Sequence, residues 1–435
     1  MSDATPHRSP IAPGYSWYEA TVGDRPEYPK LDGDIKADVC IIGGGFTGLS
    51  AAAEAAKLGA SVVLIEGSRL GDGASGRNGG QLNTGQRSEA PDHAEALGFE
   101  RAKPLFDLAE EAKAHLLGFA GENEIDIEYV AGHYSVAHKK SYVADYQRYA
   151  EVMAEKFDYP HLTFLDRHEL SKRIGSDRYF GGTYDSHTGH IHPLKLIVGA
   201  AKVAAIRGAQ IFENTRVSGT KKTANGIVVQ TASGSVTADR VLLAVNAYGD
   251  EKLNAKMASH VMPIQSFIGA TPPLEGELDE TILPDLASVD DSRFVVRYFR
   301  RSREGHMLFG GREAYSSSEP SKFVDGIRRQ MTEVYPQLKD IEITHAWGGN
   351  VGITLPREPF VRQVQPGITA IGGYSGHGVM LSNFTGKMWA EAVCGNRDRL
   401  HLLKELKVPP FPGGRRFRKP LLTLALTWYA MLDRL

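Results

Sequence analysis

The chain has 435 residues, of which 42% are hydrophobic and 23% charged, and this ordinary globular composition excludes a disordered or fibrous protein. At about 150 residues per domain, its length predicts two or three domains. The 50 basic and 52 acidic side chains give a formal net charge of −2, so the composition does not indicate nucleic-acid binding.

The N-terminal segment does not show the basic and apolar regions of a secretory signal, and no apolar run reaches the ~18 residues of a membrane span. The two cysteines, Cys40 and Cys394, are too few for a disulfide framework or a cysteine-rich metal site. Such sparse cysteine usage fits a reducing compartment. We therefore expect a soluble, cytoplasmic protein.

The segment Ala37–Glu66 predicts a strand, a helix and a second strand. Asp38–Ile42 is a short apolar run with β-branched residues, which favours a buried strand. Leu49–Leu58 has an alanine-rich helical composition, and Ser61–Ile65 is the second buried strand. Two strands joined by a helix over ~30 residues form a βαβ unit, in which the strands are parallel.

A glycine-rich turn joins the first strand to the helix and matches G-x-G-x-x-G with Gly43, Gly44, Gly45, Phe46, Thr47 and Gly48. In this context the pattern predicts dinucleotide binding: the glycines allow a tight turn, approach of a pyrophosphate and close helix packing. Glu66, at the end of the second strand, is placed to bind the ribose hydroxyls. A glycine turn without a ligand is the alternative, and the motif alone does not distinguish FAD from NAD.

Two further glycine clusters favour a large cofactor. Gly71–Gln81 directly follows the βαβ unit, and Gly372–Gly378 precedes a predicted helix over Leu381–Val393. In the first loop, Arg77 is expected near an electron-rich ring; a solvent loop is the alternative. The second cluster lies at the start of the predicted helix, where free backbone N–H groups would face a ligand.

The remaining pattern predicts a mixture of helices and strands. The helices are Ala102–Phe119 and Pro193–Arg207, and the strands are Glu128–His138, Gln210–Phe212, Gly226–Thr231, Ser235–Thr237, Arg240–Val245 and Thr369–Gly372. Phe294–Phe299 and His306–Gly310 predict a hairpin with its turn at Ser302–Gly305.

Three motifs, GGGFTGLSAA, GASGRNGGQ and GGYSGHGVMLSNFTGK, resemble those of the FAD-dependent amine and amino-acid oxidases of the D-amino-acid oxidase superfamily. The opening YSWYEA, the second motif and the C-terminal PFPGGRRFRKPLLTLALTWYAMLDRL look most like gamma-glutamylputrescine oxidoreductases. The resemblance covers essentially Tyr15 to Leu435.

The resemblance implies an α/β fold with an α+β second domain. A Rossmann-like FAD-binding domain would be discontinuous, and a substrate domain would be built on an antiparallel sheet. The implied segments are 34–89, 190–260 and 344–396 for FAD, 90–189 and 261–343 for substrate, and 397–435 for a C-terminal tail and helix. That helix would dock on its own domain or a partner, or lie on a membrane surface.

The resemblance also implies the cofactor contacts. We expect FAD to contact Gly43, Gly45, Phe46, Thr47, Gly48, Glu66, Gly73, Ala74, Ser75, Arg77, Asn78, Gly79, Gln81, Val217, Gly373, Gly376, His377, Gly378 and Val379. Many relatives attach the flavin through a cysteine in the segment matching His345–Asn350, which has none here. We therefore expect the FAD to be non-covalent.

Candidate catalytic residues are His377, Trp347 and Tyr298, and candidate substrate contacts are Arg300, Arg312, Gln81 and Tyr374. The alternatives are a satisfied structural histidine for His377, a core position for Trp347 and a solvated strand face for Arg300 and Arg312.

Two lysines of sarcosine-oxidase-like relatives are replaced in this chain, and one histidine spacing could be taken for a metal site. Met380 stands where sarcosine-oxidase-like relatives hold the substrate carboxylate with a lysine, and Leu308 and Phe309 stand where they have an oxygen-activating lysine. The spacing of His187, His190 and His192 permits a metal cluster, but we favour a turn and predict no metal.

The resemblance thus implies oxidation of the C–N bond of a small-molecule amine. The preferred substrate is gamma-glutamylputrescine, giving gamma-glutamyl-aminobutyraldehyde and ammonia, with molecular oxygen or another electron acceptor. A secondary or cyclic amino acid, such as L-pipecolate or sarcosine, is the alternative substrate. A flavin-binding redox partner without turnover is the alternative from another class, and a homo-oligomer is possible.

Overall fold

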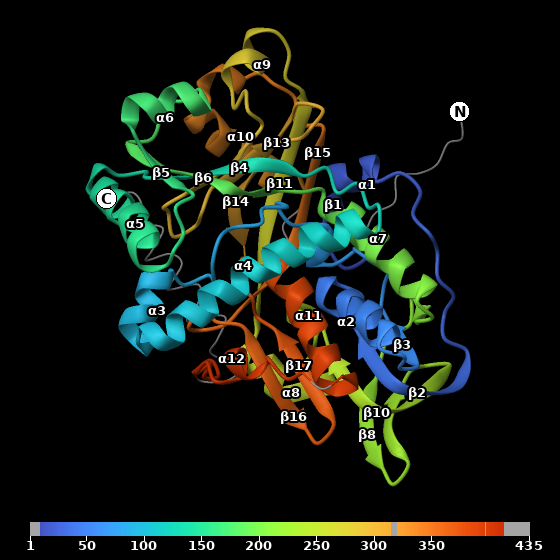
Figure 1. Cartoon of the computed structure of the whole chain (residues 1–435). Helices are drawn as coiled ribbons and strands as arrows, with labels where there is room; N and C mark the ends of the chain where they lie inside the picture. The colour runs from blue at the N-terminus through green and yellow to red at the C-terminus, as the bar shows by residue number, and fades with distance from the viewer. Residues whose placement is uncertain (1–8, 315–319, 396, 413–435) are drawn as a thin grey trace, which may run out of the picture.

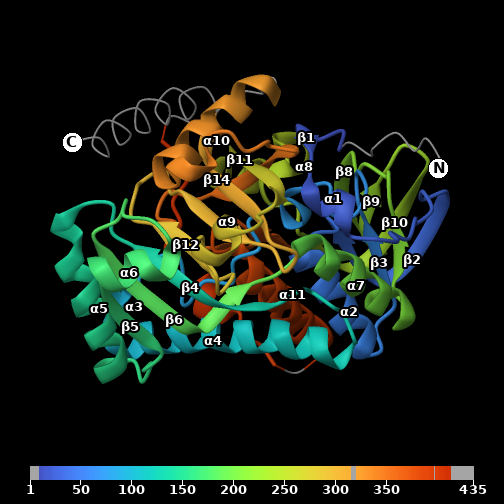
Figure 2. The same ribbon diagram turned by 90° about the horizontal axis from the view of Figure 1, so that it is seen from above.

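The computed structural model describes residues 9–314, 320–395 and 397–412, and these form two sheets with helices around them (Figure 1). The eight-stranded sheet lies in the lower half of Figure 1 and the nine-stranded sheet in the upper half. Helix α4 (Phe99–Glu122) runs across the front of the molecule, and the view from above shows it along one side (Figure 2). The expected α/β fold is confirmed.

The eight-stranded sheet has a parallel centre. Its strands, in spatial order, are β16 (Phe360–Gln365), β17 (Ile368–Gly372), β10 (Gly234–Leu243), β2 (Gly33–Ile42), β3 (Val62–Ile65) and β7 (Gln210–Phe212), with β9 (Gly226–Gln230) and β8 (Gly219–Thr223) added beside β10. Only β16, β8 and β9 pair antiparallel. The predicted βαβ unit is therefore the start of this sheet.

Three helices cover one face of this sheet. They are α2 (Phe46–Lys57), α7 (Pro193–Ile206) and α11 (Gly378–Cys394). A Cβ at Gly386 of α11 would overlap the carbonyl oxygen of Thr47 in α2, so the two helices pack with their backbones almost in contact. This close packing fixes the beginning of α11 relative to the beginning of α2.

The nine-stranded sheet is almost entirely antiparallel. Its strands, in spatial order, are β1 (Gly14–Tyr15), β15 (His345–Ile353), β11 (Met262–Pro273), β14 (His306–Ala314), β13 (Tyr298–Arg301), β12 (Ser288–Asp291), β4 (Val130–Val136), β6 (Gly181–His190) and β5 (Leu162–Asp166). Only β12 and β4 are parallel. One face carries Phe299, Phe309 and Val289, which form a hydrophobic core with the inner side of α10 (Pro320–Val334). The opposite face is turned toward the loop after β3, because a Cβ at Gly79 would lie 3.0 Å from the ring of Tyr298.

The remaining helices and turns surround these sheets. They are α1 (Trp17–Thr21), α3 (Ala90–Leu97), α5 (Val143–Lys156), α6 (Arg167–Ile174), α8 (Glu251–His260), α9 (Glu277–Thr281) and α12 (His401–Lys404), with short 3₁₀ turns at Ala74–Gly76, Lys140–Tyr142, Asn246–Tyr248 and Pro336–Leu338.

Two predicted boundaries were wrong for identifiable reasons. Ser235–Thr237 and Arg240–Val245 are parts of one strand, β10, because both halves pair with β2 in a parallel ladder without a shift of register. The hairpin strand β13 begins at Tyr298 and not at Phe294. Before it, the Asp291 carboxylate accepts the backbone N–H groups of Arg293 and Arg297, which bends the chain away from extended structure.

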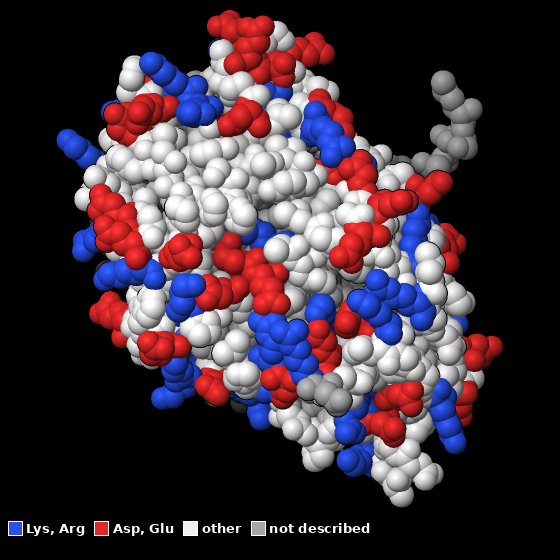
Figure 3. Space-filling view, in the orientation of Figure 1, with Lys and Arg blue, Asp and Glu red and all other residues white. Residues whose placement is uncertain are grey.

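The division into domains stays a proposal. The strand β15 pairs with β11 in the nine-stranded sheet, although it lies in the 344–396 segment assigned above to the FAD domain. The predicted C-terminal helix lies outside the described residues. Among the residues that are described, no helix is long and apolar enough to cross a membrane. On the face seen in Figure 3, acidic and basic side chains are intermixed, in agreement with the near-zero net charge.

Candidate functional site

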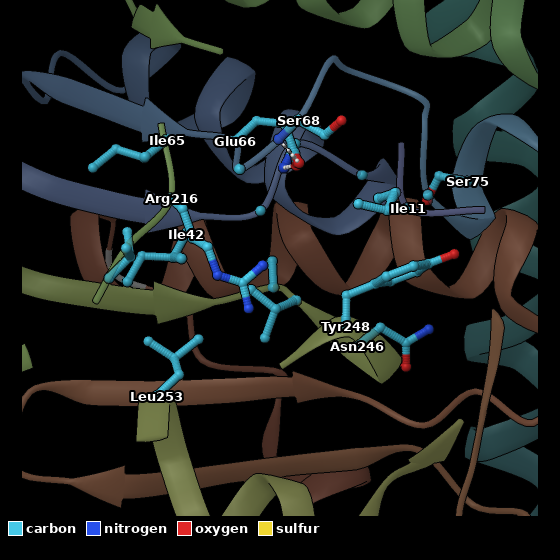
Figure 4. Close-up of a pocket in the computed structure, with 18 of the residues that line it drawn as sticks. Ile11, Ile42, Ile65, Glu66, Ser68, Ser75, Arg216, Asn246, Tyr248 and Leu253 are labelled. Atoms are coloured by element: carbon cyan, nitrogen blue, oxygen red, sulfur yellow. Dashed lines mark hydrogen bonds between the residues drawn. The ribbon is translucent and has the colours of Figure 1, made fainter. Parts of the chain in front are cut away.

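A cavity lies at the carboxyl ends of β2, β3 and β10 (Figure 4). This is the edge at which open α/β sheets bind their ligands. Of the residues predicted to bind the cofactor, those lining the cavity are Gly43, Gly45, Glu66, Gly73, Ala74, Ser75 and Val217. The cavity thus brings together residues from both ends of the βαβ unit and from a segment 150 residues further along the chain.

The three motif glycines have different reasons to lack a side chain. Gly43 has φ +109°, and a Cβ there would lie 2.6 Å from the carbonyl oxygen of Ala244. A Cβ at Gly48 would overlap the carbonyl oxygen of Gly43. At Gly45 the only near neighbour is the side chain of Ser75, with its Oγ at 2.8 Å. Gly43 and Gly48 therefore serve the fold, whereas Gly45 keeps the cavity wall open.

Glu66 is tied to the glycine turn by its carboxylate. Its Oε2 accepts a hydrogen bond from Gly44 N at 2.7 Å, and its Oε1 accepts one from Ser68 N at 2.9 Å. Burial raises the pKa of Glu66 above its ordinary value, while these two backbone donors act in the opposite direction. The side chain borders the cavity, where its remaining lone pairs can accept from a ligand hydroxyl.

The opposite wall contains residues that the sequence analysis missed. Arg216 extends into the cavity between Ile42 and Tyr248 in Figure 4, and its guanidinium pairs with Asp250 at 3.5 Å. Asn246 also lines the cavity and accepts a hydrogen bond from Gly373 N at 2.8 Å. The signal for Asn246 and Tyr248 was available, since both follow the carboxyl end of the predicted strand Arg240–Val245.

Several predicted cofactor contacts do not line this cavity. They are Phe46, Thr47, Gly48, Arg77, Asn78, Gly79, Gln81, Gly373, Gly376, His377, Gly378 and Val379. The Asn78 side chain stabilises the turn of its own loop. It donates to the carbonyl oxygens of Ala74 and Ser75 and accepts from Gly80 N.

Arg77 has a structural role, which corrects the interpretation that it faces an electron-rich ring. Its guanidinium is buried and donates to the carbonyl oxygens of Gly348, Pro13 and Gly14 at 2.7–2.9 Å. Three backbone acceptors hold it in place, so it joins the glycine loop to β1 and β15.

A second polar region lies on the face of the nine-stranded sheet that is turned toward the glycine loop. Cross-strand partners share a face, and the register places Gly310, Tyr298, Asp290 and Ser135 in one row. A Cβ at Gly79 would come within 3.0 Å of the Tyr298 ring, so the loop lies directly on this row. The Tyr298 hydroxyl is 2.9 Å from Ser266 Oγ.

His377 approaches this region from α11, whose N-cap it forms. Burial and the positive charge of Arg87 lower the pKa of His377 to about 3, although Asp290 acts in the opposite direction. The imidazole is therefore neutral near pH 7.

The geometry does not support Arg300 as a substrate anchor. Its guanidinium is buried and donates to Gly79 O, Ile191 O and the hydroxyl of Tyr18, and it also contacts His190 Nδ1 at 3.1 Å. Four of its five N–H groups therefore have partners within the protein.

The other predicted side chains also have partners within the protein. Trp347 is fully buried and donates to Arg77 O at 3.0 Å, and the Tyr374 hydroxyl contacts Thr47 Oγ1 at 3.0 Å. Gln81 bridges β12 and β6. Arg312, in β14, lies opposite Phe267 of β11. Its side chain is outside the described part of the structure.

The histidine cluster acts in the fold. His192 caps α7 by accepting from Lys195 N, and His190 Nε2 is 2.8 Å from Leu286 O. Within the described residues, no group of three or more His, Cys, Asp or Glu side chains has the arrangement of a metal site.

Comparison with known proteins places these features in a family context. A family model described as FAD dependent oxidoreductase matches residues 38–392. A probable oxidoreductase OrdL of Rhizobium meliloti strain 1021 is 56% identical over 427 residues, covering 98% of this chain and 99% of that protein. The gamma-glutamylputrescine oxidoreductase of Escherichia coli strain K12 is 33% identical over 420 residues, covering 97% of this chain and 98% of that protein. The crystal structure of glycine oxidase from Geobacillus kaustophilus superposes with a TM-score of 0.74 at 21% identity, over 86% of this chain and 100% of that one, which shows a shared fold.

Proposed function

The chain belongs to the FAD dependent oxidoreductase family, and from this premise we propose that it oxidises the primary amine of gamma-glutamylputrescine. The C–N bond is oxidised to an imine, which water hydrolyses to gamma-glutamyl-aminobutyraldehyde and ammonia. The observation that carries the substrate is the 33% identity to gamma-glutamylputrescine oxidoreductase over nearly the whole of both chains.

The cavity fits the family's cofactor. The open wall at Gly45 is a cradle that a Cβ would narrow, and a carboxylate borders the same space. In our proposal Gly43 and Gly45 hold the pyrophosphate, Glu66 the adenosine ribose and Val217 the adenine. When bound, FAD supplies the acceptor for the two electrons removed from the amine.

The chain's own residues prepare the amine for this reaction. His377 is neutral because burial and Arg87 hold its pKa near 3, so it adds no positive charge that would repel the substrate. Met380, buried in the first turn of α11, offers no cation to a carboxylate next to the reacting carbon. These two features favour an amine end without an adjacent carboxylate.

A secondary or cyclic amino acid remains the second candidate substrate, because the fold is shared with glycine oxidase. Such a substrate would carry its carboxylate beside the reacting nitrogen. In this chain Met380 occupies the position from which the lysine of sarcosine-oxidase-like relatives would reach it.

Anaerobic reduction of the bound flavin tests the proposal. The holoprotein is mixed without oxygen with gamma-glutamylputrescine, putrescine, sarcosine, L-pipecolate and glycine, and bleaching of the flavin absorbance is followed. We expect the fastest bleaching with gamma-glutamylputrescine, and faster bleaching by an amino acid would reverse the assignment. Absence of bleaching with every amine would instead favour a redox partner without turnover. Admission of oxygen then shows whether oxygen is the acceptor.

A further inference from the structure

The N-terminal segment, residues 9–14, supplies part of the wall of the cofactor cavity. Ile11 lines that cavity together with the glycine turn after β2 and the loop after β3. In Figure 4 its side chain lies on the same side of the cavity as Ser75 and Tyr248, which come from two other segments. The family match begins at residue 38, so this part of the wall lies outside the region that the match covers.

Ile11 leaves apolar surface uncovered at this wall. Its exposed fraction is 37%, and among the large hydrophobic side chains that are exposed in the described part of the structure, it is the only one that lines the cavity. A ligand in the cavity can therefore remove apolar surface of Ile11 from water, which is favourable.

The hydroxyl of Ser9 fixes one end of the segment to the loop after β3. Ser9 is buried, and its Oγ donates to Asp72 O at 3.2 Å and accepts from Ile11 N at 3.2 Å. Asp72 is held in turn by Ser68, whose Oγ donates to its Oδ2 at 2.7 Å. One hydroxyl thus connects the backbone of Ile11 with a loop that lines the same cavity.

The other end of the segment is fixed to the glycine loop and to β15. The Arg77 guanidinium donates to Pro13 O at 2.7 Å and to Gly14 O at 2.9 Å, and Gly348 N donates to Pro13 O at 3.0 Å. Gly14 has φ +78°, and a Cβ there would overlap the carbonyl oxygen of Ala346. The chain can approach β15 this closely only because residue 14 is a glycine.

Two prolines restrict the segment between these ends. Pro10 and Pro13 stand on either side of Ile11 and Ala12, and the ring of each proline fixes its own φ. Ile11 is therefore held at the cavity before any ligand binds. A contact that is already in place costs little conformational entropy when the ligand arrives.

We propose that the N-terminal segment is an additional part of the FAD site, in which Ile11 packs against the bound cofactor and slows its release. The inference rests on the proposed function only in that FAD occupies this cavity, and it does not depend on which amine is oxidised. Ser9 is a positioning residue that acts through Ile11. An apolar contact of this kind stabilises the complex, so its loss appears mainly in the rate of dissociation.

Release of FAD from the holoprotein tests this inference without any substrate. The holoprotein is diluted stepwise, and the fluorescence of the released FAD is followed. The rate at which the fluorescence rises gives the rate constant of release, and the final value at each dilution gives the dissociation constant. Thermal unfolding of each holoprotein is measured beside it.

Ile11→Ala should speed the release of FAD about fivefold or more and raise the dissociation constant by a similar factor, because fewer apolar atoms cover the cofactor. Ile11→Val should give an intermediate effect. Ile206→Ala is the matched control: it makes the same change at an isoleucine that is 85% exposed at the end of α7 and does not line the cavity. This control should alter neither constant.

Ser9→Ala should also speed the release, because it removes the bond to Asp72 O and the acceptor of Ile11 N. If Ser9 acts through Ile11, the double variant Ser9→Ala/Ile11→Ala should release FAD no faster than Ile11→Ala alone. Additive effects of the two changes would overturn the positioning role of Ser9.

Unchanged release from Ile11→Ala, or an equal change in Ile206→Ala, would overturn the inference. A lower thermal midpoint of Ile11→Ala without faster release would assign Ile11 to the fold and overturn it as well. Failure of the cofactor placement looks different, because Glu66→Gln would then also leave the affinity for FAD unchanged. A wrong amine substrate would appear only in the bleaching experiment, since release is measured without an amine.

Discussion

Glu66 Oε2 accepts a hydrogen bond of 2.7 Å from the backbone N–H of Gly44, which joins the carboxyl end of β3 to the turn after β2. The acidic residue and the glycine motif are therefore one structural unit as well as two parts of one binding site. The same carboxylate also accepts from Ser68 N at 2.9 Å. A change at Glu66 is expected to affect the ligand and the shape of the turn together.

Glu66→Gln should lower the affinity for FAD about tenfold or more while the fold is retained. The amide group has one acceptor oxygen where the carboxylate has two, and charge-assisted hydrogen bonds contribute about 1.5–3 kcal/mol each. Fluorescence titration of the apoprotein with FAD measures the change, and Glu100→Gln on the exposed surface is the control. An unchanged affinity would show that Glu66 does not bind the ribose.

Gly45→Ala and Gly48→Ala should separate binding from folding. The methyl group at position 45 meets only the Ser75 side chain, so the protein should fold and bind FAD less tightly. The methyl group at position 48 would overlap the Gly43 carbonyl, so the soluble yield or the thermal midpoint should fall sharply. Comparable FAD affinity and stability in the two variants would contradict these roles.

Arg300→Met should destabilise the protein without changing substrate preference. It leaves the buried acceptors of Gly79, Ile191 and Tyr18 without their donor, and each buried group left unsatisfied costs about 1–3 kcal/mol. Thermal unfolding and the ratio of KM values for gamma-glutamylputrescine and putrescine are measured together. Arg303→Met, an exposed change, is the control. A normal thermal midpoint with a tenfold change in that ratio would restore a substrate role.

His115→Gln should make the protein less sensitive to acid. Burial, aided by Lys387, lowers the pKa of His115 to about 4. As the pH falls below about 6.5, the unfolded chain binds a proton that the folded chain does not, so this contribution to stability is present above pH ~6.5 and lost toward pH ~4.

Thermal unfolding between pH 7 and 5 tests this effect. The fall in the midpoint should be about 1–2 °C smaller in His115→Gln than in the unmodified protein. His168→Gln, at an exposed position, should not alter the fall. An identical fall in all three proteins would exclude His115 as an acid-sensitive group.

Acid or denaturant should release all of the FAD. Cys40 is buried in β2 and Cys394 lies at the end of α11, so neither is at the beginning of that helix or in β15. The flavin absorbance is measured in the supernatant and in the precipitated protein. Colour that stays with the precipitate would show a covalent bond.

The sequence by itself determined the βαβ unit, the glycine turn and the acidic residue after β3. These depend on short-range patterns: an apolar strand, glycines required by backbone overlap, and an alanine-rich helix. The superfamily was also accessible, because its three motifs are local. Asn246 and Tyr248 could have been added from the same rule about strand ends.

Only the tertiary structure decided what the charged side chains do. Arg77 and Arg300 are both near predicted ligand contacts in sequence, but their acceptors come from Pro13, Gly348, Tyr18 and Ile191. Arg87 has an equally polar setting in sequence, but it forms no hydrogen bond or ion pair with a residue that the structure describes. A guanidinium reaches several ångströms from its backbone, so its partners depend on which distant segments pack around it, and local patterns do not encode that packing.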